Sequence, residues 1–158
     1  MTRAVVFDRC VDQARALAAR FRKQGIDASA VHPTDLDLTF DDAGGLPDFV
    51  VTELQMPMLS GVELIRRVRS VWPGGEPALI AFTTVDDPEL WAAARAAGAD
   101  EVVLRRGQDA MLRLDVAIDQ CLGRTAPAKG VTAVGHDRPA PAGFWSRLFG
   151  RRTAAAAA

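Results

Sequence analysis

Two periods of apolar and polar residues alternate along residues 1–122. Short apolar or alternating runs predict five strands, at residues 4–7, 26–31, 49–52, 78–82 and 101–105. Apolar residues spaced three or four apart predict helices at residues 11–24, 61–71, 88–97 and 108–122. Residues 32–46 settle on no apolar face, so we expect a short or irregular helix there. The alternation predicts an α/β fold, a doubly wound, five-stranded parallel sheet with helices on both faces.

Polar residues stand at the ends of three of these strands. Asp8 follows the first strand, Glu53 the third and Thr83 the fourth. Ligands of open parallel sheets bind outside the carboxyl ends of the strands, where the strand order switches. We therefore expect these three side chains to converge and to form the site of the protein.

Three segments around these positions resemble the receiver domain of response regulators, the CheY-like module of two-component signalling. They read PDFVVTELQMPMLSGVELIRRVR, ALIAFTT and AARAAGADEVVLR. The intervals of 30 residues from Glu53 to Thr83 and 22 from Thr83 to Arg105 match those of the family. The resemblance covers residues 3–122 and implies the flavodoxin-like strand order 2-1-3-4-5.

The resemblance also implies a phosphotransfer site, and the sequence departs from it at three of five positions. Active receivers hold Mg²⁺ with an acidic pair after the first strand and an aspartate after the third, which accepts the phosphoryl group. A hydroxyl after the fourth strand and a lysine after the fifth grip the phosphate. Asp8 and Thr83 match this pattern, whereas Arg9 replaces the second acid, Glu53 the phosphoacceptor and Arg105 the lysine. The family's aromatic switch position in the fifth strand is Val102, and Arg106 stands in place of a proline.

These departures predict that phosphotransfer is lost. An arginine places a cation where the hard Mg²⁺ ion needs carboxylate oxygen. Glu53 is one methylene longer than aspartate, so its oxygen is misplaced for in-line attack. The planar fork of Arg105 is not a point ammonium. We therefore expect a vestigial pocket without a catalytic residue, cofactor or metal, in which Asp8 and Glu53 would be the ligands if Mg²⁺ bound at all.

Two interpretations of this pocket stay open. In the first, Arg9 stands in for the metal and Glu53 for the acyl phosphate, and both pair with Asp8 and Arg105 in a network that holds one conformation. In the second, these residues are relics, solvated at the rim of the sheet. A true phosphoacceptor that uses Glu53 in a Mg²⁺-dependent phosphorelay is the alternative function.

Composition and charge divide the chain into a body and a tail. Residues 1–122 carry thirteen basic and nineteen acidic side chains, and residues 123–158 carry six basic and one acidic. Cys10 and Cys121 make no metal-ligand spacing with either histidine, so we interpret both as reduced thiols of a cytoplasmic protein. No apolar run approaches the ~18 residues that a membrane span requires.

The tail predicts a tethered peptide. Residues 123–143 are rich in Pro, Ala and Gly and predict a flexible linker, and residues 153–158 predict a disordered end. Between them, residues 144–152 form an aromatic and basic peptide. If it is helical, one face carries Phe144, Trp145, Leu148 and Phe149, and basic residues that include Arg151 flank this face. This peptide suits a groove on a protein partner, a weak contact with an anionic membrane, or docking on its own acidic body.

These features together predict a pseudo-receiver, a phosphorylation-independent signalling or adaptor module that is not an enzyme. Its partners are proteins, with a membrane-recruited scaffold as a further alternative. The resemblance implies a partner-binding or homodimer face that includes Trp91 and Val102. No helix-turn-helix pattern follows residue 122, so we expect no nucleic-acid partner.

Overall fold

The computed structural model describes residues 1–31 and 46–123. The irregular helix expected at residues 32–46 therefore falls almost wholly outside the described residues. The predicted linker beyond Gly123 and the peptide at residues 144–152 also lie outside them.

Five parallel strands form one sheet in the order β2-β1-β3-β4-β5, as predicted. The strands are β1 (Arg3–Phe7), β2 (Asp27–Val31), β3 (Phe49–Thr52), β4 (Ala78–Thr83) and β5 (Glu101–Leu104). β3 and β4 are buried along their whole length, which explains why each is apolar up to the threonine that ends it. β5 ends one residue earlier than predicted, so Arg105 lies just beyond the strand.

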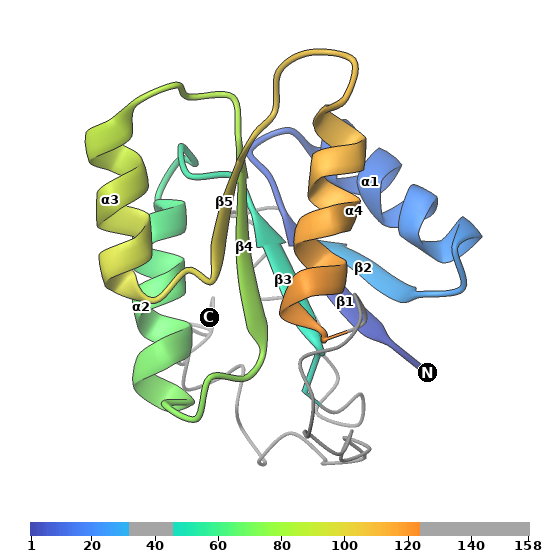
Figure 1. Cartoon of the computed structure of the whole chain (residues 1–158), viewed down its shortest axis with the longest axis horizontal. Helices are drawn as coiled ribbons and strands as arrows, with labels where there is room; N and C mark the ends of the chain where they lie inside the picture. The colour runs from blue at the N-terminus through green and yellow to red at the C-terminus, as the bar shows by residue number, and fades with distance from the viewer. Residues whose placement is uncertain (32–45, 124–158) are drawn as a thin grey trace, which may run out of the picture.

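In the part of the chain that the structure describes, four helices cover the two faces of the sheet; three of them connect consecutive strands and the last follows β5 (Figure 1). They are α1 (Val11–Lys23), α2 (Gly61–Val71), α3 (Pro88–Ala97) and α4 (Ala110–Cys121). Two helices begin at a side-chain cap: the Ser60 hydroxyl accepts from the Glu63 amide, and the Asp87 carboxylate accepts from the Glu89 amide. α4 begins two residues later than predicted, because Gly107 adopts a left-handed turn (φ 86°) ahead of it.

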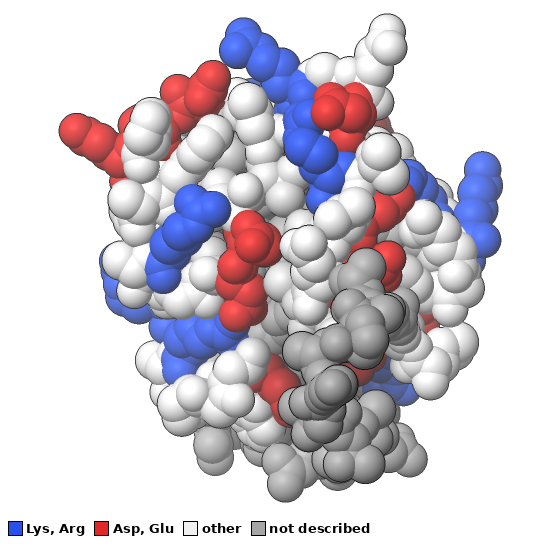
Figure 2. Space-filling model, viewed as in Figure 1, with Lys and Arg blue, Asp and Glu red and all other residues white. Residues whose placement is uncertain are grey.

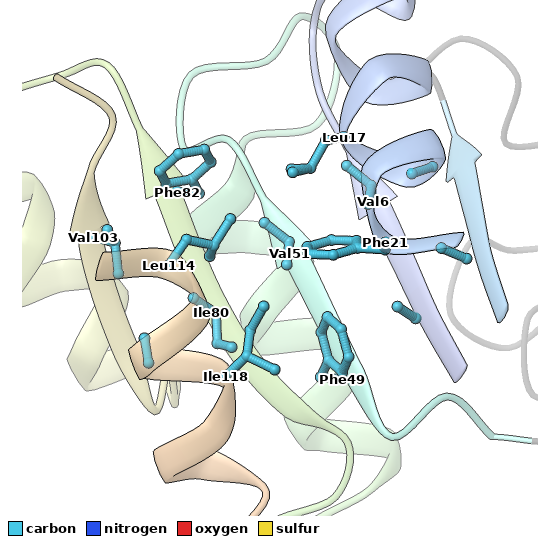
Figure 3. Close-up of a cluster of buried hydrophobic side chains, with 14 of the residues drawn as sticks. Val6, Leu17, Phe21, Phe49, Val51, Ile80, Phe82, Val103, Leu114 and Ile118 are labelled. Carbon is cyan, nitrogen blue, oxygen red and sulfur yellow. The ribbon is translucent and has the colours of Figure 1, made fainter. Parts of the chain in front are cut away.

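One half of the core lies between the sheet and the pair α1 and α4. Alternate residues of the strands, such as Val6, Val51 and Ile80, point into it (Figure 3). Phe21 of α1 meets Phe49 of β3 edge to face, with ring centroids 5.5 Å apart.

The other half of the core lies beneath α2 and α3. The intervening strand residues, such as Val5, Val50 and Leu79, point into it and meet Leu64 and Ile65 of α2. Burial on both faces fixes the register of the central strands, because a shift by one residue would exchange the two faces. The carboxyl ends of the strands are thereby held at one edge.

Candidate functional site

The carboxyl ends of β1, β3 and β4 bring Asp8, Glu53 and Thr83 to the same edge of the sheet, as predicted. The Glu53 amide donates to the Phe7 carbonyl at 3.0 Å, which holds the ends of β1 and β3 side by side. Glu53 is 3% exposed, Asp8 4% and Thr83 0%. The interpretation of these residues as solvated at the rim is wrong for Asp8 and Glu53, because both side chains are buried.

The Glu53 carboxylate is surrounded by neutral hydrogen-bond donors. Its Oε1 accepts from the amides of Leu54 at 2.7 Å and Gln55 at 3.3 Å, and from the Thr83 hydroxyl. Its Oε2 accepts from the Thr84 amide at 3.1 Å and from the Thr84 hydroxyl at 3.4 Å. Hydrogen bonds to the charged form compensate its burial, since an unsolvated carboxylate is otherwise costly.

Asp8 is paired with a cation. Its Oδ2 accepts from the Arg105 guanidinium at 2.7 Å, and its Oδ1 accepts from the Cys10 amide at 2.8 Å. The two side chains of this ion pair are 6% and 16% exposed. The guanidinium carbon also lies 5.2 Å from the ring centroid of Phe82, within the range of a cation–π contact.

The predicted network thus has two described parts, an Asp8–Arg105 pair and a Glu53–Thr83–Thr84 cluster. The described contacts of Glu53 come from amides and hydroxyls, whereas the sequence interpretation assigned it a guanidinium. Arg9 follows Asp8 directly, and its side chain is exposed. Sequence reasoning did not find Thr84 as a partner of Glu53, although the Thr-Thr pair at the end of β4 is a signal for it.

The side chains of this pocket do not fit a bound Mg²⁺ ion. Each of the four carboxylate oxygens of Asp8 and Glu53 accepts a hydrogen bond from a protein donor. Arg9 supplies no oxygen at the second acidic position. Across residues 1–31 and 46–123, no group of three or more His, Cys, Asp or Glu side chains is arranged to hold a metal.

The predicted partner-face residues Trp91 and Val102 are half-buried and pack against the core beneath α2 and α3. The indole N–H of Trp91 donates to the Val85 carbonyl at 2.8 Å. Phe144, Trp145, Leu148, Phe149 and Arg151 lie outside the described residues.

The two cysteines differ in position. Cys10 is the N-cap residue of α1, beside the pocket. Cys121 packs against the core at the end of α4, where burial raises the pKa of its thiol to about 11, helped by the charges of Asp100 and Glu101. Burial keeps the Cys121 thiol protonated at neutral pH, which agrees with a structural role.

Comparison with known proteins identifies the fold. No protein-family model matches the chain, and no curated protein matches it significantly. Among solved structures, the chemotaxis response regulator CheY4 of Vibrio cholerae matches with a TM-score of 0.62 and 17% identity, over 75% of this chain and 98% of that one. The receiver domain of a histidine kinase from Syntrophus aciditrophicus matches with a TM-score of 0.61 and 19% identity, over 85% and 100% of the two chains.

A third match was solved with a metal and a fluoride complex. The response regulator TrrA of Thermotoga maritima, in complex with Mg²⁺ and BeF, matches with a TM-score of 0.60 and 22% identity, over 77% of this chain and all of that one. No helix of the described segments is long and apolar enough to cross a membrane.

Strand order, helix placement and these three structural matches agree: the chain has the fold of the receiver domains of response regulators.

Proposed function

We propose that this chain is a pseudo-receiver, a cytoplasmic signalling or adaptor module that binds protein partners without being phosphorylated and is not an enzyme. The observation that carries the proposal is the state of Glu53. Its buried carboxylate already accepts hydrogen bonds from two hydroxyls and three backbone amides.

The donors around Glu53 are the groups that a phosphoryl group would need. The resemblance to receivers assigns the hydroxyl after β4 to the phosphate, and here that hydroxyl, on Thr83, donates to Glu53. A phosphoryl group on Glu53 would have to displace these bonds within a pocket that is 3% exposed at this residue. The carboxylate is therefore better placed as a permanent ligand of the pocket than as a nucleophile.

The cation at the end of β5 is engaged in the same way. The resemblance assigns that position to a lysine that grips the phosphate, and here Arg105 is bound to Asp8. Removing Arg105 from Asp8 would leave a carboxylate buried without a counter-charge, which costs several kcal/mol in such sites. Asp8 and Arg105 thus stabilise each other and favour the unphosphorylated form.

Labelling with radioactive acetyl phosphate in the presence of Mg²⁺ tests this proposal. We expect no label on the wild-type chain and none on Glu53→Gln. The triple variant Glu53→Asp, Arg9→Asp, Arg105→Lys restores the family's acids and lysine and is expected to gain label if the three departures are the cause. Label on the wild-type chain that requires Mg²⁺ and disappears in Glu53→Gln would establish the alternative, a phosphorelay through Glu53.

A titration followed by amide NMR tests binding separately from chemistry. We expect millimolar Mg²⁺, followed by beryllofluoride, to leave the amide signals of Asp8, Glu53 and Thr83 in place. Shifts confined to these residues and spreading toward β5 would mean that the pocket still binds metal and a phosphoryl mimic. The proposal would then fail even without detectable phosphotransfer.

The tail enters the proposal as a docking peptide, residues 144–152, for a protein partner. Its support is the sequence, in which aromatic and basic side chains follow a linker after an acidic body. Figure 2 shows acidic and basic side chains interspersed over the visible face of the body, without a broad basic area such as nucleic-acid binding uses. A peptide that carries the localisation signal would act independently of the pocket.

Cosedimentation with anionic vesicles tests whether the tail binds a membrane rather than a protein partner. We expect no binding to phosphatidylserine vesicles by the full chain, or by a chain that ends at residue 143. If the full chain binds these vesicles and the double variant Phe144→Ala, Trp145→Ala does not, the tail binds a membrane, and the proposal of a protein partner for it fails. Sedimentation velocity on the same samples reports whether the chain forms a homodimer.

A further inference from the structure

We infer that Trp91 is a positioning residue that couples the Glu53 pocket to helix α3 through the loop between β4 and α3. The inference rests on the proposed function for its role in signalling, since it names the path by which the pocket reaches a partner-facing helix. Hydrogen bonds between described residues carry it.

The first link joins Glu53 to the start of this loop. The Thr83 hydroxyl donates to Oε1, and the amide and hydroxyl of Thr84 donate to Oε2. Within this loop, Oε1 thus binds Thr83 and Oε2 binds Thr84. The loop can keep this arrangement only while both oxygens accept.

The second link runs through Val85. Its amide donates to the Thr83 hydroxyl oxygen at 3.2 Å, and its carbonyl accepts from the Trp91 indole at 2.8 Å. The Thr83 hydroxyl therefore donates to Glu53 and accepts from Val85, an arrangement in which each bond polarises the next. Val85 is held from the pocket on one side and from α3 on the other.

The third link fixes the ring to its helix. The Trp91 amide donates to the Asp87 carbonyl at 3.0 Å in the first turn of α3, and the ring packs against the core beneath α2 and α3. Val102 of β5 packs against the same core, at the position where the resemblance places an aromatic switch. In this chain the aromatic side chain that contacts the loop comes from α3.

Glu53→Gln is the sharpest variant for testing the path. Glutamine keeps one acceptor oxygen for Leu54, Gln55 and Thr83, but it places an NH₂ group opposite the Thr84 amide, where two donors face each other. We expect the Trp91 indole N–H signal in a ¹⁵N NMR spectrum to shift and its exchange with solvent to rise about tenfold, the loss of one ordinary hydrogen bond. The indole of Trp72, the C-cap residue of α2, is the internal reference and is expected to stay in place.

A second pair of variants keeps the test valid if Glu53→Gln fails to fold. Thr83→Val removes the hydroxyl that joins Glu53 to Val85 and is expected to move the Trp91 indole signal in the same direction. Thr83→Ser keeps a hydroxyl and is expected to restore the wild-type position of that signal. If Thr83 had only a structural role, the Trp91 indole signal would not differ between Thr83→Val and Thr83→Ser.

The reverse direction uses Trp91→Phe, which keeps an aromatic ring and removes the N–H donor. We expect the amide signals of Thr84 and Val85 to shift and exchange faster, whereas Trp72→Phe, the matched control, leaves them in place. An indole signal of Trp91 that ignores both Glu53→Gln and Thr83→Val would overturn the coupling. Equal effects of Trp91→Phe and Trp72→Phe on the Thr84 amide would also overturn it.

These measurements need no Mg²⁺ and no phosphodonor, so they separate the two claims. If the wild-type chain takes label but the indole responds as expected, the proposed function fails and the coupling stands. If the chain takes no label and the indole does not respond, the coupling alone fails.

Discussion

Single residues decide what the pocket can do, and Glu53 is the clearest case. Its side chain turns back to the amides of Leu54 and Gln55 and also reaches across to Thr83 and Thr84. The strand end, the following loop and the neighbouring strand are therefore tied by one carboxylate. The start of α2 lies directly against the backbone of Glu53 and Leu54, and the lack of a side chain at Gly61 allows this close contact.

Gly61→Ala is expected to destabilise the protein by about 1–3 kcal/mol, the range of an overpacked site. A Cβ at this position would lie 2.2 Å from the Glu53 carbonyl oxygen and 2.8 Å from the Leu54 Cα, both in the backbone. Urea unfolding measures the loss. Gly74→Ala is the matched control, because nothing lies within 4 Å of its added Cβ; equal stability of the two variants would contradict the prediction.

Among the elements, α2 shows how similar side chains on one helix differ in their effect. Arg66 and Arg67 pair with exposed Glu63, whose carboxyl pKa they lower by hydrogen bonding, Arg67 first. Arg69 instead donates to the carbonyls of Gly98 and Pro77, both at 2.9 Å. α2 is thus joined through Arg69 to the turn that ends α3.

The contact of Arg69 extends to two further residues of the same region. Its guanidinium pairs with Asp100 at 2.6 Å, and Asp100 also accepts from the Leu79 amide at 2.7 Å. Gly98 ends α3 in the left-handed region (φ 113°), and a Cβ there would lie 2.5 Å from the Arg69 side chain. A side chain at position 98 would therefore collide with Arg69, which is why a glycine stands there.

Arg69→Met is expected to lower the free energy of unfolding by about 2 kcal/mol, because it removes the donor to two partly buried carbonyls and the partner of Asp100. Arg66→Met, on the same helix, is expected to change it by less than about 0.5 kcal/mol, as is usual for an exposed pair. Chemical denaturation of the two variants side by side gives the comparison. A similar small effect at both positions would mean that Arg69 is an ordinary surface residue.

Across the whole molecule, the first and last described helices are joined over one face of the sheet. Arg20 of α1 contacts Asp115 of α4 through two hydrogen bonds, of 2.7 and 2.5 Å. The hydrogen bond with Asp115 raises the pKa of Arg20, and both side chains are about one third exposed. Because the two residues are 95 positions apart, the contact stabilises the closed fold rather than a local segment.

A double-mutant cycle measures this contact. We expect Arg20→Met and Asp115→Leu each to destabilise, with a coupling energy of about 1 kcal/mol, at the lower end of the range for hydrogen-bonded neighbours because solvent reaches the pair. Arg3 and Asp27 form a matched, more exposed pair at 3.8 Å and are expected to show almost no coupling. Equal coupling in the two cycles would contradict the distinction.

Much of the fold follows from the sequence because its signals are local. The period of apolar residues gave the five strands, and the bounds of β3 and α2 agree residue for residue. Departures are confined to element ends, as at β5 and α4, where neighbouring turns decide the last hydrogen bonds. The convergence of Asp8, Glu53 and Thr83 was also predictable, because parallel strands end at one edge.

The partners of each site residue were decided only by the tertiary structure. The sequence placed two carboxylates and two arginines near one another, but spacing along the chain does not say which groups meet at 3 Å. The folded chain pairs Arg105 with Asp8, and it surrounds Glu53 with threonine hydroxyls and backbone amides. The period of apolar residues thus determined the sheet and the edge at which the site lies, whereas the packing of loops against strand ends decided which donors bind the Glu53 carboxylate.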